Sequence, residues 1–355
     1  MGTCCTRVRH VPASFPGVPW KDTAIITLFT PRACTSSDVP FPLLATDAQE
    51  FTLTAADDVP VRGAWWDPAP GTTPRGILQV VHGMSEHLGR YTPLIDAARA
   101  QGWAVIGHDH RGHGRTAGSV ERLGHLADAD GWDAAVGDVV AVTRRARATA
   151  PGLPVVLLGH SFGSFVVRDV AIRFGSEIDA LVVMGTSGAP TPLQRVGYYL
   201  TALSSAFFGP SHAAHIIDRI NSVGYNDGID PLRTNRDWLS RNPDVPDAFL
   251  ADPWCGAVPS SGFMHDITVG LRRINDPELI ALVPDELPVL LISGEADPVG
   301  ERGAGPREVL AQYLAAGVRD VTLTLYPEGR HEPLNDVHSA CVRGDVLGWA
   351  QRAVG

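Results

Sequence analysis

The chain has 355 residues, 44% hydrophobic and 19% charged, which is enough for a large buried core and argues against a disordered chain. Acidic residues outnumber basic ones 39 to 29, giving a formal net charge of −10. This balance excludes nucleic acid as a partner, because the phosphate backbone would be repelled, and the absence of any run of about 18 or more apolar residues excludes an integral membrane segment.

Residues 1–45 differ in composition from the rest of the chain. They contain six prolines and show no periodicity beyond residues 24–29. The opening Met1-Gly2-Thr3-Cys4-Cys5-Thr6 matches the N-myristoylation pattern, but so short a pattern often arises by chance, and no apolar stretch of signal-peptide length follows. We therefore interpret residues 1–45 as a flexible N-terminal extension.

Cysteine and lysine usage indicates the cellular compartment. The five cysteines lack metal-ligand spacing, and three of them lie in the first 34 residues, which favours reduced thiols over a disulfide framework. Lys21 is the only lysine, an arginine bias typical of a GC-rich bacterial genome. We expect a cytoplasmic bacterial protein.

Beyond residue 50, strand-like and helix-like segments alternate. Two short segments bounded by turns, 51–53 and 59–66, predict an opening antiparallel pair. The later strand-like runs are continuously apolar, which is typical of parallel strands covered by helices on both faces. We predict an α/β fold, a mostly parallel, doubly wound sheet with helices on both faces. Its strands are expected over 76–81, 103–107, 153–158, 178–184, 288–293 and 321–326, and its helices over 91–101, 132–148, 164–174, 306–316 and 341–353.

Residues 190–265 interrupt this alternation. An apolar stretch with helical spacing is followed by a stretch rich in Pro, Asp and Asn. An insertion after a strand of a wound sheet is where a lid would be placed, so we predict a helical cap at 190–265 between two parts of the α/β core, 46–189 and 266–355. Ordinary packing between helices would produce the same apolar pattern, but we take the candidate substrate-binding side chains to be Tyr198, Tyr199, Phe207 and Phe208.

The strongest chemical signal is Gly159-His160-Ser161-Phe162-Gly163. This G-x-S-x-G match directly follows a buried strand and directly opens a helix, the context in which such a turn carries a nucleophile. Glycines two residues before and after the serine allow the tight turn, and the helix N-terminus favours developing negative charge. We predict Ser161 as the nucleophile.

A serine nucleophile needs a base, and the base needs an orienting acid. In this architecture the chain order is Ser, then Asp or Glu, then His. Asp297 follows the strand at 288–293, and His331 follows the strand at 321–326, so both lie at the edge of the sheet where active-site groups gather. Glu295 is a rival acid, which we interpret as a solvated loop carboxylate. His265 and His338 lack this combination of order and position and are interpreted as structural.

The oxyanion formed by serine attack needs backbone N–H donors. The residue after the nucleophile, Phe162, supplies one, and the loop after the strand at 76–81 nominates Met84 for the other.

The run His108-Asp109-His110-Arg111-Gly112-His113 is also compatible with a zinc site, because three histidines and a carboxylate lie within six residues. Hydrolysis by a serine triad requires neither a metal nor a cofactor, so we predict that none is used. The histidines are then hydrogen-bonded or exposed groups at a strand end.

Five ordered segments resemble a known group, the monoacylglycerol lipase and lysophospholipase branch of α/β-hydrolases, also described as serine-aminopeptidase-like. The resemblance covers about residues 50–352 and departs at Thr116, where the branch usually has Ser. It implies a cap after the sixth strand, carboxylester hydrolysis without a cofactor, the triad Ser161, Asp297 and His331, and the oxyanion donors Met84 and Phe162. The segments are His82–His87 with Arg90-Tyr91, Asp109–Thr116, Gly159–Gly163, Asp297–Gly300 and Arg330–Glu332 with Asn335.

We therefore predict a serine hydrolase that cleaves carboxylic esters of single-chain acyl lipids, with a small acyl ester as its partner and transient contact of the cap with lipid surfaces. One alternative is an amidase or aminopeptidase on the same triad, whose cap would bind a substrate amine; another is a short-chain esterase. A binding protein without catalysis is disfavoured because no triad member is missing. The acidic candidates for an amine are Asp218, Asp227, Asp230 and Asp237.

Overall fold

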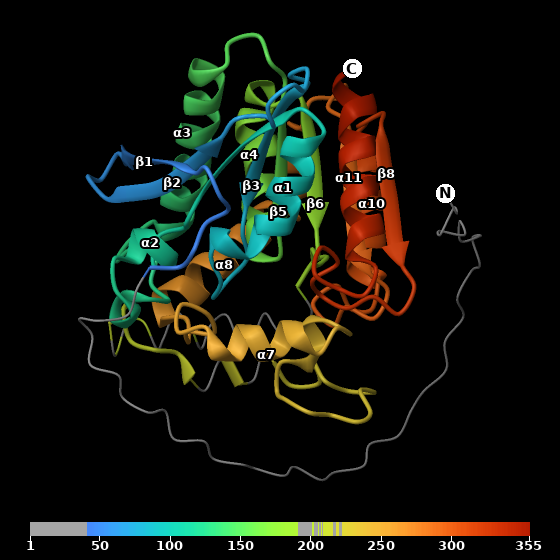
Figure 1. The fold of residues 1–355 in the computed structure, drawn as a ribbon. Coiled ribbons are helices and arrows are strands. Elements are labelled where there is room, and N and C mark those ends of the chain that lie inside the picture. Colours follow the sequence, from blue (N-terminus) through green and yellow to red (C-terminus); the bar gives the residue numbers. More distant parts are fainter. Residues whose placement is uncertain are drawn as a thin grey trace.

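The computed structural model describes residues 41–190, 209–215 and 222–355, together with Thr201, Ser205, Phe207, Asp218 and Arg219 (Figure 1). Residues 1–40 of the extension predicted at 1–45 and three of the proposed substrate-binding residues, Tyr198, Tyr199 and Phe208, lie outside these residues. Among the described residues, no helix is both long and apolar enough to cross a bilayer.

One eight-stranded sheet runs through the molecule in the order β1-β2-β4-β3-β5-β6-β7-β8. The pairs β1·β2 and β2·β4 are antiparallel and the other pairs are parallel, which confirms the mostly parallel α/β sheet with an antiparallel start. The strands are β1 (Gln49–Thr54), β2 (Pro60–Trp66), β3 (Gly76–Val81), β4 (Trp103–His108), β5 (Val155–His160), β6 (Ala180–Met184), β7 (Val289–Gly294) and β8 (Val321–Tyr326).

Burial along the strands explains why the sequence forms this sheet. Every residue of β3, β4, β5, β6 and β7 is buried, as expected for apolar strands with helices on both faces, whereas β1 and β8 at the two edges are partly exposed. The antiparallel β1 alternates exposed and buried positions, and only its Phe51 is fully buried.

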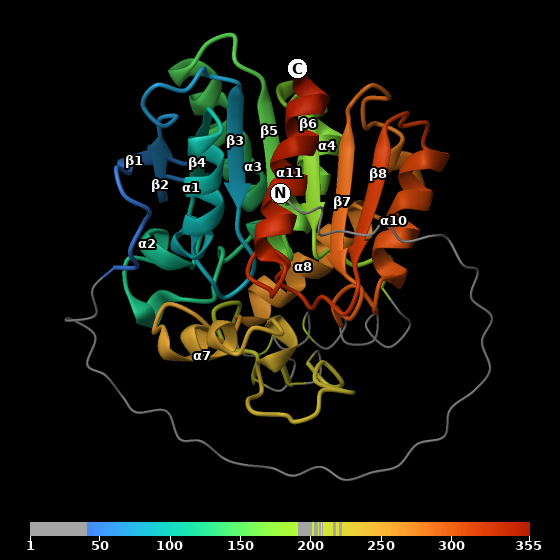
Figure 2. The ribbon, with the colours of Figure 1, turned by 45° about the vertical axis from the view of Figure 1, so that its right-hand side comes forward.

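Helices cover both faces of the sheet. Helices α1 and α11 pack on one face in a core that includes Leu94, Ile95 and Val346, and Figure 2 shows them in front of the strands. Helices α3, α4, α8 and α10 build the core on the other face. The helices are α1 (Thr92–Ala100), α2 (Gly114–Ala117), α3 (Gly131–Thr149), α4 (Phe162–Phe174), α7 (Asp244–Ala251), α8 (Ser261–Arg273), α9 (Pro277–Ile280), α10 (Ala304–Ala315) and α11 (Ser339–Val354), with short 3-10 segments at Leu88–Tyr91, Val120–Arg122, Gly175–Glu177 and Asp237–Leu239.

The predicted elements are present, and their boundaries differ by at most two residues, as they do around the nucleophile turn. The sequence predicted a strand ending at residue 158 and a helix beginning at residue 164. In the structure β5 continues to His160 and α4 begins at Phe162, because β5 keeps its pairing with β6 through His160. Ser161 is therefore the single residue between the two elements.

The described part of the β6–β7 connection lies across the edge of the sheet where the parallel strands end. Figures 1 and 2 show α7 and the neighbouring coil below that edge, which is the edge toward which the arrow of β8 points. Trp238, Leu239 and Phe249 form a small apolar core of their own within this connection. The connection is therefore in a position to border any site at the strand ends.

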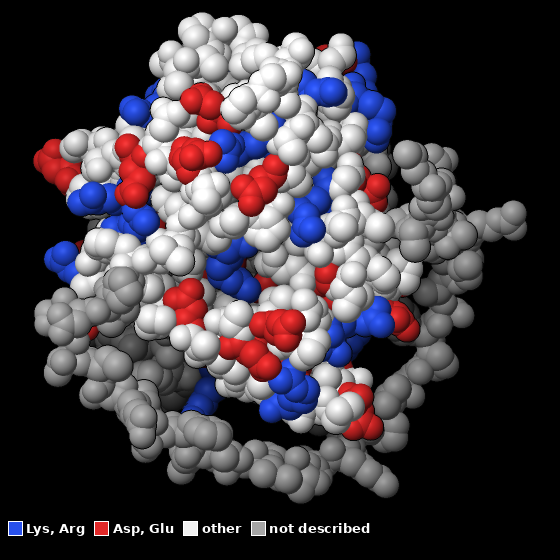
Figure 3. Space-filling view, in the orientation of Figure 1, with Lys and Arg blue, Asp and Glu red and all other residues white. Residues whose placement is uncertain are grey.

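Charged side chains of both signs are interspersed over the described surface in Figure 3. The face drawn there has no continuous basic field among its described residues.

Candidate active site

Ser161 has a strained backbone at the N-terminus of a helix. Its φ is 53° and its ψ is −120°, a conformation that costs a non-glycine residue free energy. Its N–H donates to the Met184 carbonyl at 2.9 Å, which fixes the turn to the end of β6. Because α4 starts at the next residue, the helix dipole favours negative charge beside Ser161.

The two glycines of the turn are required by close approaches. A Cβ on Gly159 would lie 2.4 Å from the Gly163 carbonyl oxygen, and a Cβ on Gly163 would lie 2.3 Å from the Val81 carbonyl oxygen. The second contact presses the start of α4 against the end of β3. The glycine spacing of the motif thus brings the nucleophile turn and the loop after β3 together.

Asp297 and His331 form a buried hydrogen-bonded pair. His331 Nδ1 lies 2.9 Å from Asp297 Oδ1, and the Val299 N–H donates to the same oxygen at 2.9 Å. Burial acts to raise the pKa of Asp297, but the charge and hydrogen bond of His331 outweigh it, so the pKa is lowered and the carboxylate is ionised at neutral pH. Since an ionised carboxylate only accepts, the proton sits on Nδ1, and His331 Nε2 carries the lone pair a general base needs.

The structure separates the predicted acid and base from their rivals. The Glu295 side chain is 45% exposed and lies 4.0 Å from Arg307, whereas Asp297 is the carboxylate that bonds His331. His338 is exposed and precedes α11, while His265 is half-buried within α8. Of the residues considered as the acid or the base of the triad, only Asp297 and His331 are hydrogen-bonded to each other.

The loop after β3 lies beside the nucleophile. A Cβ on Gly83 would be 3.1 Å from the Ser161 Cβ, so the loop that carries Met84, the residue after Gly83, comes close to Ser161. The Phe162 N–H belongs to the first residue of α4 and is not needed by the helix. The Phe162 N–H and the loop of Met84 thus lie near the nucleophile, and the oxyanion role of the Met84 and Phe162 N–H groups stays a prediction.

A buried ionic network lies behind these loops, and the sequence analysis did not assign it. Arg90 donates to Glu332 through two nitrogens, both at 2.8 Å, and to Glu86 at 2.6 Å. The Tyr91 hydroxyl donates to Glu86 at 2.8 Å. Glu86 lies on the loop with Met84, and Glu332 directly follows His331, so the network joins the predicted oxyanion loop to the predicted base loop.

His160 completes this network from the nucleophile turn. Its Nε2 donates to the His331 carbonyl at 3.0 Å, and its Nδ1 lies 3.2 Å from Glu86 Oε1 and 3.0 Å from the Tyr91 hydroxyl. Burial acts to lower the pKa of His160, but the hydrogen bond to Glu86 and its charge outweigh it, so the pKa is raised. The residue at the variable position before the nucleophile therefore ties Ser161 to the loop of His331.

The histidines considered as zinc ligands form a buried cluster with His82. The His110 ring lies 4.5 Å from the His82 ring and 5.2 Å from the His108 ring, measured between centroids. The His110 N–H donates to His82 Nε2 at 2.9 Å, and burial lowers the pKa of His108 and His113 to about 4. The cluster packs as neutral imidazoles under the loop after β3. The sequence interpretation of hydrogen-bonded or exposed histidines is wrong for His108, which is fully buried and has no ring hydrogen bond among the described residues.

A second set of metal-ligating side chains lies at the β6–β7 connection. The nearest ligand atoms of His87, Asp252 and Cys255 all lie within 4.8 Å of one another. His87 Nδ1 accepts from the Gly89 N–H, so its Nε2 carries a proton and donates to Asp252 at 2.8 Å. This hydrogen bond already satisfies the histidine and the carboxylate, and it links the connection to the loop after β3.

Aromatic side chains of the β6–β7 connection border His331. The Trp238 ring lies 5.0 Å from the His331 ring, and the backbone of Glu332 donates to the Leu239 carbonyl at 2.8 Å. Phe207, a residue predicted to bind substrate, is 77% exposed in the structure. The sequence analysis missed Trp238, since a tryptophan in a Pro- and Asp-rich stretch gives no local signal of a catalytic neighbour.

Comparison with known proteins places this fold and site in a family. A model of the serine aminopeptidase S33 family matches residues 72–338. The monoacylglycerol lipase of Mycolicibacterium smegmatis is 31% identical over 285 residues, which cover 79% of this chain and 89% of that protein. The human monoglyceride lipase is 27% identical over 270 residues, covering 75% of this chain and 78% of that protein.

A solved structure agrees with these relatives. A highly thermostable carboxyl esterase from Bacillus coagulans superposes with a TM-score of 0.81 at 26% identity, over 88% of this chain and 100% of that one. The chain therefore belongs to the serine aminopeptidase S33 family of α/β-hydrolases, in its monoacylglycerol lipase-like branch, and is a carboxylester hydrolase.

Proposed function

We propose that the protein hydrolyses carboxylic esters of single-chain acyl lipids, such as monoacylglycerols or lysophospholipids, through Ser161, His331 and Asp297. The main support is the 2.9 Å hydrogen bond between His331 and an ionised Asp297, at the same edge of the sheet as the strained Ser161 turn. The relatives named monoacylglycerol or monoglyceride lipase support the lipid class of the substrate.

The geometry supports a two-step acyl transfer. Ser161 Oγ attacks the ester carbonyl carbon while His331 Nε2 takes the hydroxyl proton, and Asp297 stabilises the imidazolium that forms. The N–H groups of Met84 and Phe162 stabilise the oxyanion. The tetrahedral intermediate then expels the alcohol, which receives the proton from His331 and leaves an acyl group on Ser161. Water, deprotonated by the same histidine, releases the fatty acid and restores the serine.

In this proposal residues 190–265 act as a cap over the acyl site. Trp238 borders the base, and Tyr198, Tyr199, Phe207 and Phe208 supply apolar contacts for the substrate chain. With 77% of its surface exposed, Phe207 suits contact with a lipid surface better than the lining of a closed tunnel.

Hydrolysis of p-nitrophenyl esters from acetyl to palmitoyl, together with a monoacylglycerol, tests the proposal. Wild-type activity should peak at medium or long chains. Ser161→Ala should fold normally, as judged by circular dichroism, and lose about 10⁴-fold or more of kcat/KM because the nucleophile is absent. A fully active Ser161→Ala variant would overturn the mechanism, and activity confined to acetyl and butyryl esters would overturn the lipid substrate in favour of a short-chain esterase.

His331→Ala and His338→Ala form a matched pair for the base. The first should lose activity to a similar degree as Ser161→Ala, since both act in one unit. The exposed His338 precedes α11 without a side-chain capping bond, so its variant should retain wild-type kcat/KM.

The amidase alternative has less support from the described residues. The Asp237 carboxylate accepts hydrogen bonds from the Arg233 and Thr234 backbones and from the Thr234 hydroxyl, so it is committed within its own turn. Asp227 belongs to the lining of a cavity that also contains three arginines, which does not suit a cationic amine. Matched acyl esters and aminoacyl anilides discriminate: faster turnover of the anilides would favour the amidase.

A further inference from the structure

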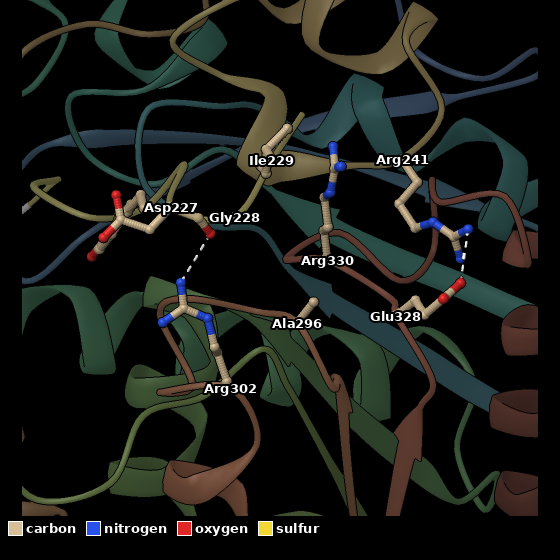
Figure 4. Close-up of a pocket in the computed structure, with 9 residues that line it drawn as sticks. Asp227, Gly228, Ile229, Arg241, Ala296, Arg302, Glu328 and Arg330 are labelled. Carbon is tan, nitrogen blue, oxygen red and sulfur yellow. Dashed lines mark hydrogen bonds and ion pairs between the residues drawn. The ribbon is translucent and has the colours of Figure 1, made fainter. Parts of the chain in front are cut away.

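A cavity lies beside the proposed acid and base, between the β6–β7 connection and the core. Its volume is about 380 Å³, within the range of small-molecule sites. The connection contributes Tyr225, residues 227–229 and Arg241, while the loops after β7 and β8 contribute the rest of the lining. Figure 4 shows these side chains around the cavity; those from the core are Ala296, Arg302, Glu328 and Arg330.

Three arginines dominate the charge of this cavity. Arg241, Arg302 and Arg330 line it together with two acidic residues, Asp227 and Glu328, so its lining carries a net positive charge although the whole chain is acidic. Cations gathered in a cavity attract an anionic ligand and raise its local concentration.

Two of the arginines have unused donors. Arg330 donates from Nη1 to the Asp237 and Ser240 carbonyls, at 2.7 and 2.9 Å, and Arg302 donates from Nη2 to the Asp227 carbonyl at 3.1 Å. A guanidinium has five N–H donors, so among the described residues both arginines keep N–H groups that no carboxylate occupies. Burial lowers the pKa of Arg330 even though the charges of Asp336 and Asp237 act to raise it.

The acidic groups of the lining do not neutralise these two arginines. Glu328 pairs with Arg241 at 2.9 Å, and 75% of its side chain is exposed, so this ion pair is weak and open to exchange. The Asp227 carboxylate folds back toward Gly224, where an added Cβ would lie 3.2 Å from its Oδ2. Asp336 accepts the Arg330 backbone N–H at 2.8 Å.

Residues that line the cavity are neighbours of the proposed acid and base. Ala296 precedes Asp297, and Arg330 precedes His331. The Tyr225 ring lies 4.8 Å from the Trp238 ring, which in turn lies 5.0 Å from His331. A ligand held here would therefore touch both the connection and the loops that carry the acid and the base.

We propose that this cavity binds a phosphate group through Arg302, Arg330 and Arg241. Planar guanidinium groups bind phosphate oxygens through paired, charge-assisted N–H donors, and three of them suit a group with several equivalent oxygens better than a single carboxylate. The phosphate is either the headgroup of a single-chain acyl ester or a free anion that joins the connection to the core. The headgroup form rests on the proposed function; the free-anion form does not.

Calorimetric titration of the Ser161→Ala variant with inorganic phosphate and with glycerol 3-phosphate tests the site without turnover. Saturable one-to-one binding is expected. Adding Arg302→Gln should weaken binding about tenfold or more, because a charge-assisted hydrogen bond is lost. Arg319→Gln removes the same charge from an exposed residue before β8, at the opposite edge of the sheet, and should leave the affinity unchanged. Absence of saturable binding, or equal binding with and without Arg302, would overturn the proposal.

Kinetics on matched decanoyl substrates distinguish the two sources of phosphate. If the headgroup binds, Arg302→Gln raises KM for decanoyl lysophosphatidic acid about tenfold relative to monodecanoylglycerol, and inorganic phosphate competes only with the former. If free phosphate binds, it changes the turnover of both substrates, and Arg302→Gln removes that response. Wild-type protein that hydrolyses neither substrate would refute the proposed function, while the calorimetry would still decide the site.

Discussion

A cluster of four buried histidines and the single buried His160 lie near the nucleophile turn, and their pKa values shift in opposite directions. His82, His108, His110 and His113 contact one another without a carboxylate at hydrogen-bond distance, and burial lowers the pKa of each. His160 is equally buried, yet its pKa is raised because Glu86 lies 3.2 Å from its Nδ1. The presence of a carboxylate partner, rather than depth of burial, therefore decides the direction in which the pKa of each buried imidazole shifts.

The contrast extends to what each group does for the site. The carboxylate network around His160 joins Glu86 and Glu332 to the Arg90 guanidinium and the His160 ring, and it holds the loops on either side of Ser161 together. The histidine cluster supports the loop after β3 by packing and backbone contacts alone. Breaking the carboxylate network should lower the free energy of unfolding already at neutral pH, whereas the histidine cluster should destabilise the fold only as the pH falls.

Arg90→Met should have the largest effect on this contrast. The variant leaves Glu86 and Glu332 buried without their shared cation, and such a loss costs about 3–5 kcal/mol in the free energy of unfolding. Urea unfolding measures this change, and ester hydrolysis on the folded fraction should fall because both loops lose their common anchor.

Arg144→Met is the control for that experiment. Arg144 pairs with Glu177 on the surface, where its side chain is 62% exposed, so its loss should change stability little. Equal losses in the two variants would contradict the importance of the buried network.

Tyr91→Phe should have a smaller effect on the same network. It removes one hydroxyl that donates to the buried Glu86 carboxylate, a loss of about 2 kcal/mol in the free energy of unfolding. Tyr326→Phe is a matched variant, since its hydroxyl donates to Asp345 at 2.7 Å, but Asp345 is exposed and water can replace the bond. If both variants lose the same stability, burial of the acceptor carboxylate is unimportant.

Much of the fold and the reacting residues could be predicted from the sequence. Continuously apolar runs predicted the parallel strands, and the order of Ser161, Asp297 and His331 after three of them predicted their common edge. These signals are local, since each depends on a strand, a turn and a neighbouring residue type.

The supporting groups could not be predicted in the same way. Arg90 and Glu332 are separated by 242 residues and meet only because the loops after β3 and β8 converge at one edge of the sheet. His160 occupies a position that the nucleophile motif leaves free, and Trp238 and the arginine-lined cavity depend on how the β6–β7 connection folds over that edge. Long-range convergence of polar side chains has no periodic signature in the chain.

Because of the histidine cluster we expect the protein to lose stability in acid, and the His108→Leu variant should lose less stability than the wild type. A histidine with a folded pKa of about 4 and an unfolded value of 6.5 stabilises the fold fully above pH 6.5 and loses that contribution as pH falls toward 4. Between pH 7.5 and 5.5 each such histidine removes about 1 kcal/mol from the free energy of unfolding. Both ring nitrogens of His108 lack a hydrogen-bond partner among the described residues, so leucine, which is similar in volume and does not titrate, should be tolerated at pH 7.5. Urea unfolding of both proteins at the two pH values measures the difference, and an unchanged acid loss in the variant would show that the pKa of His108 is not lowered in the folded protein.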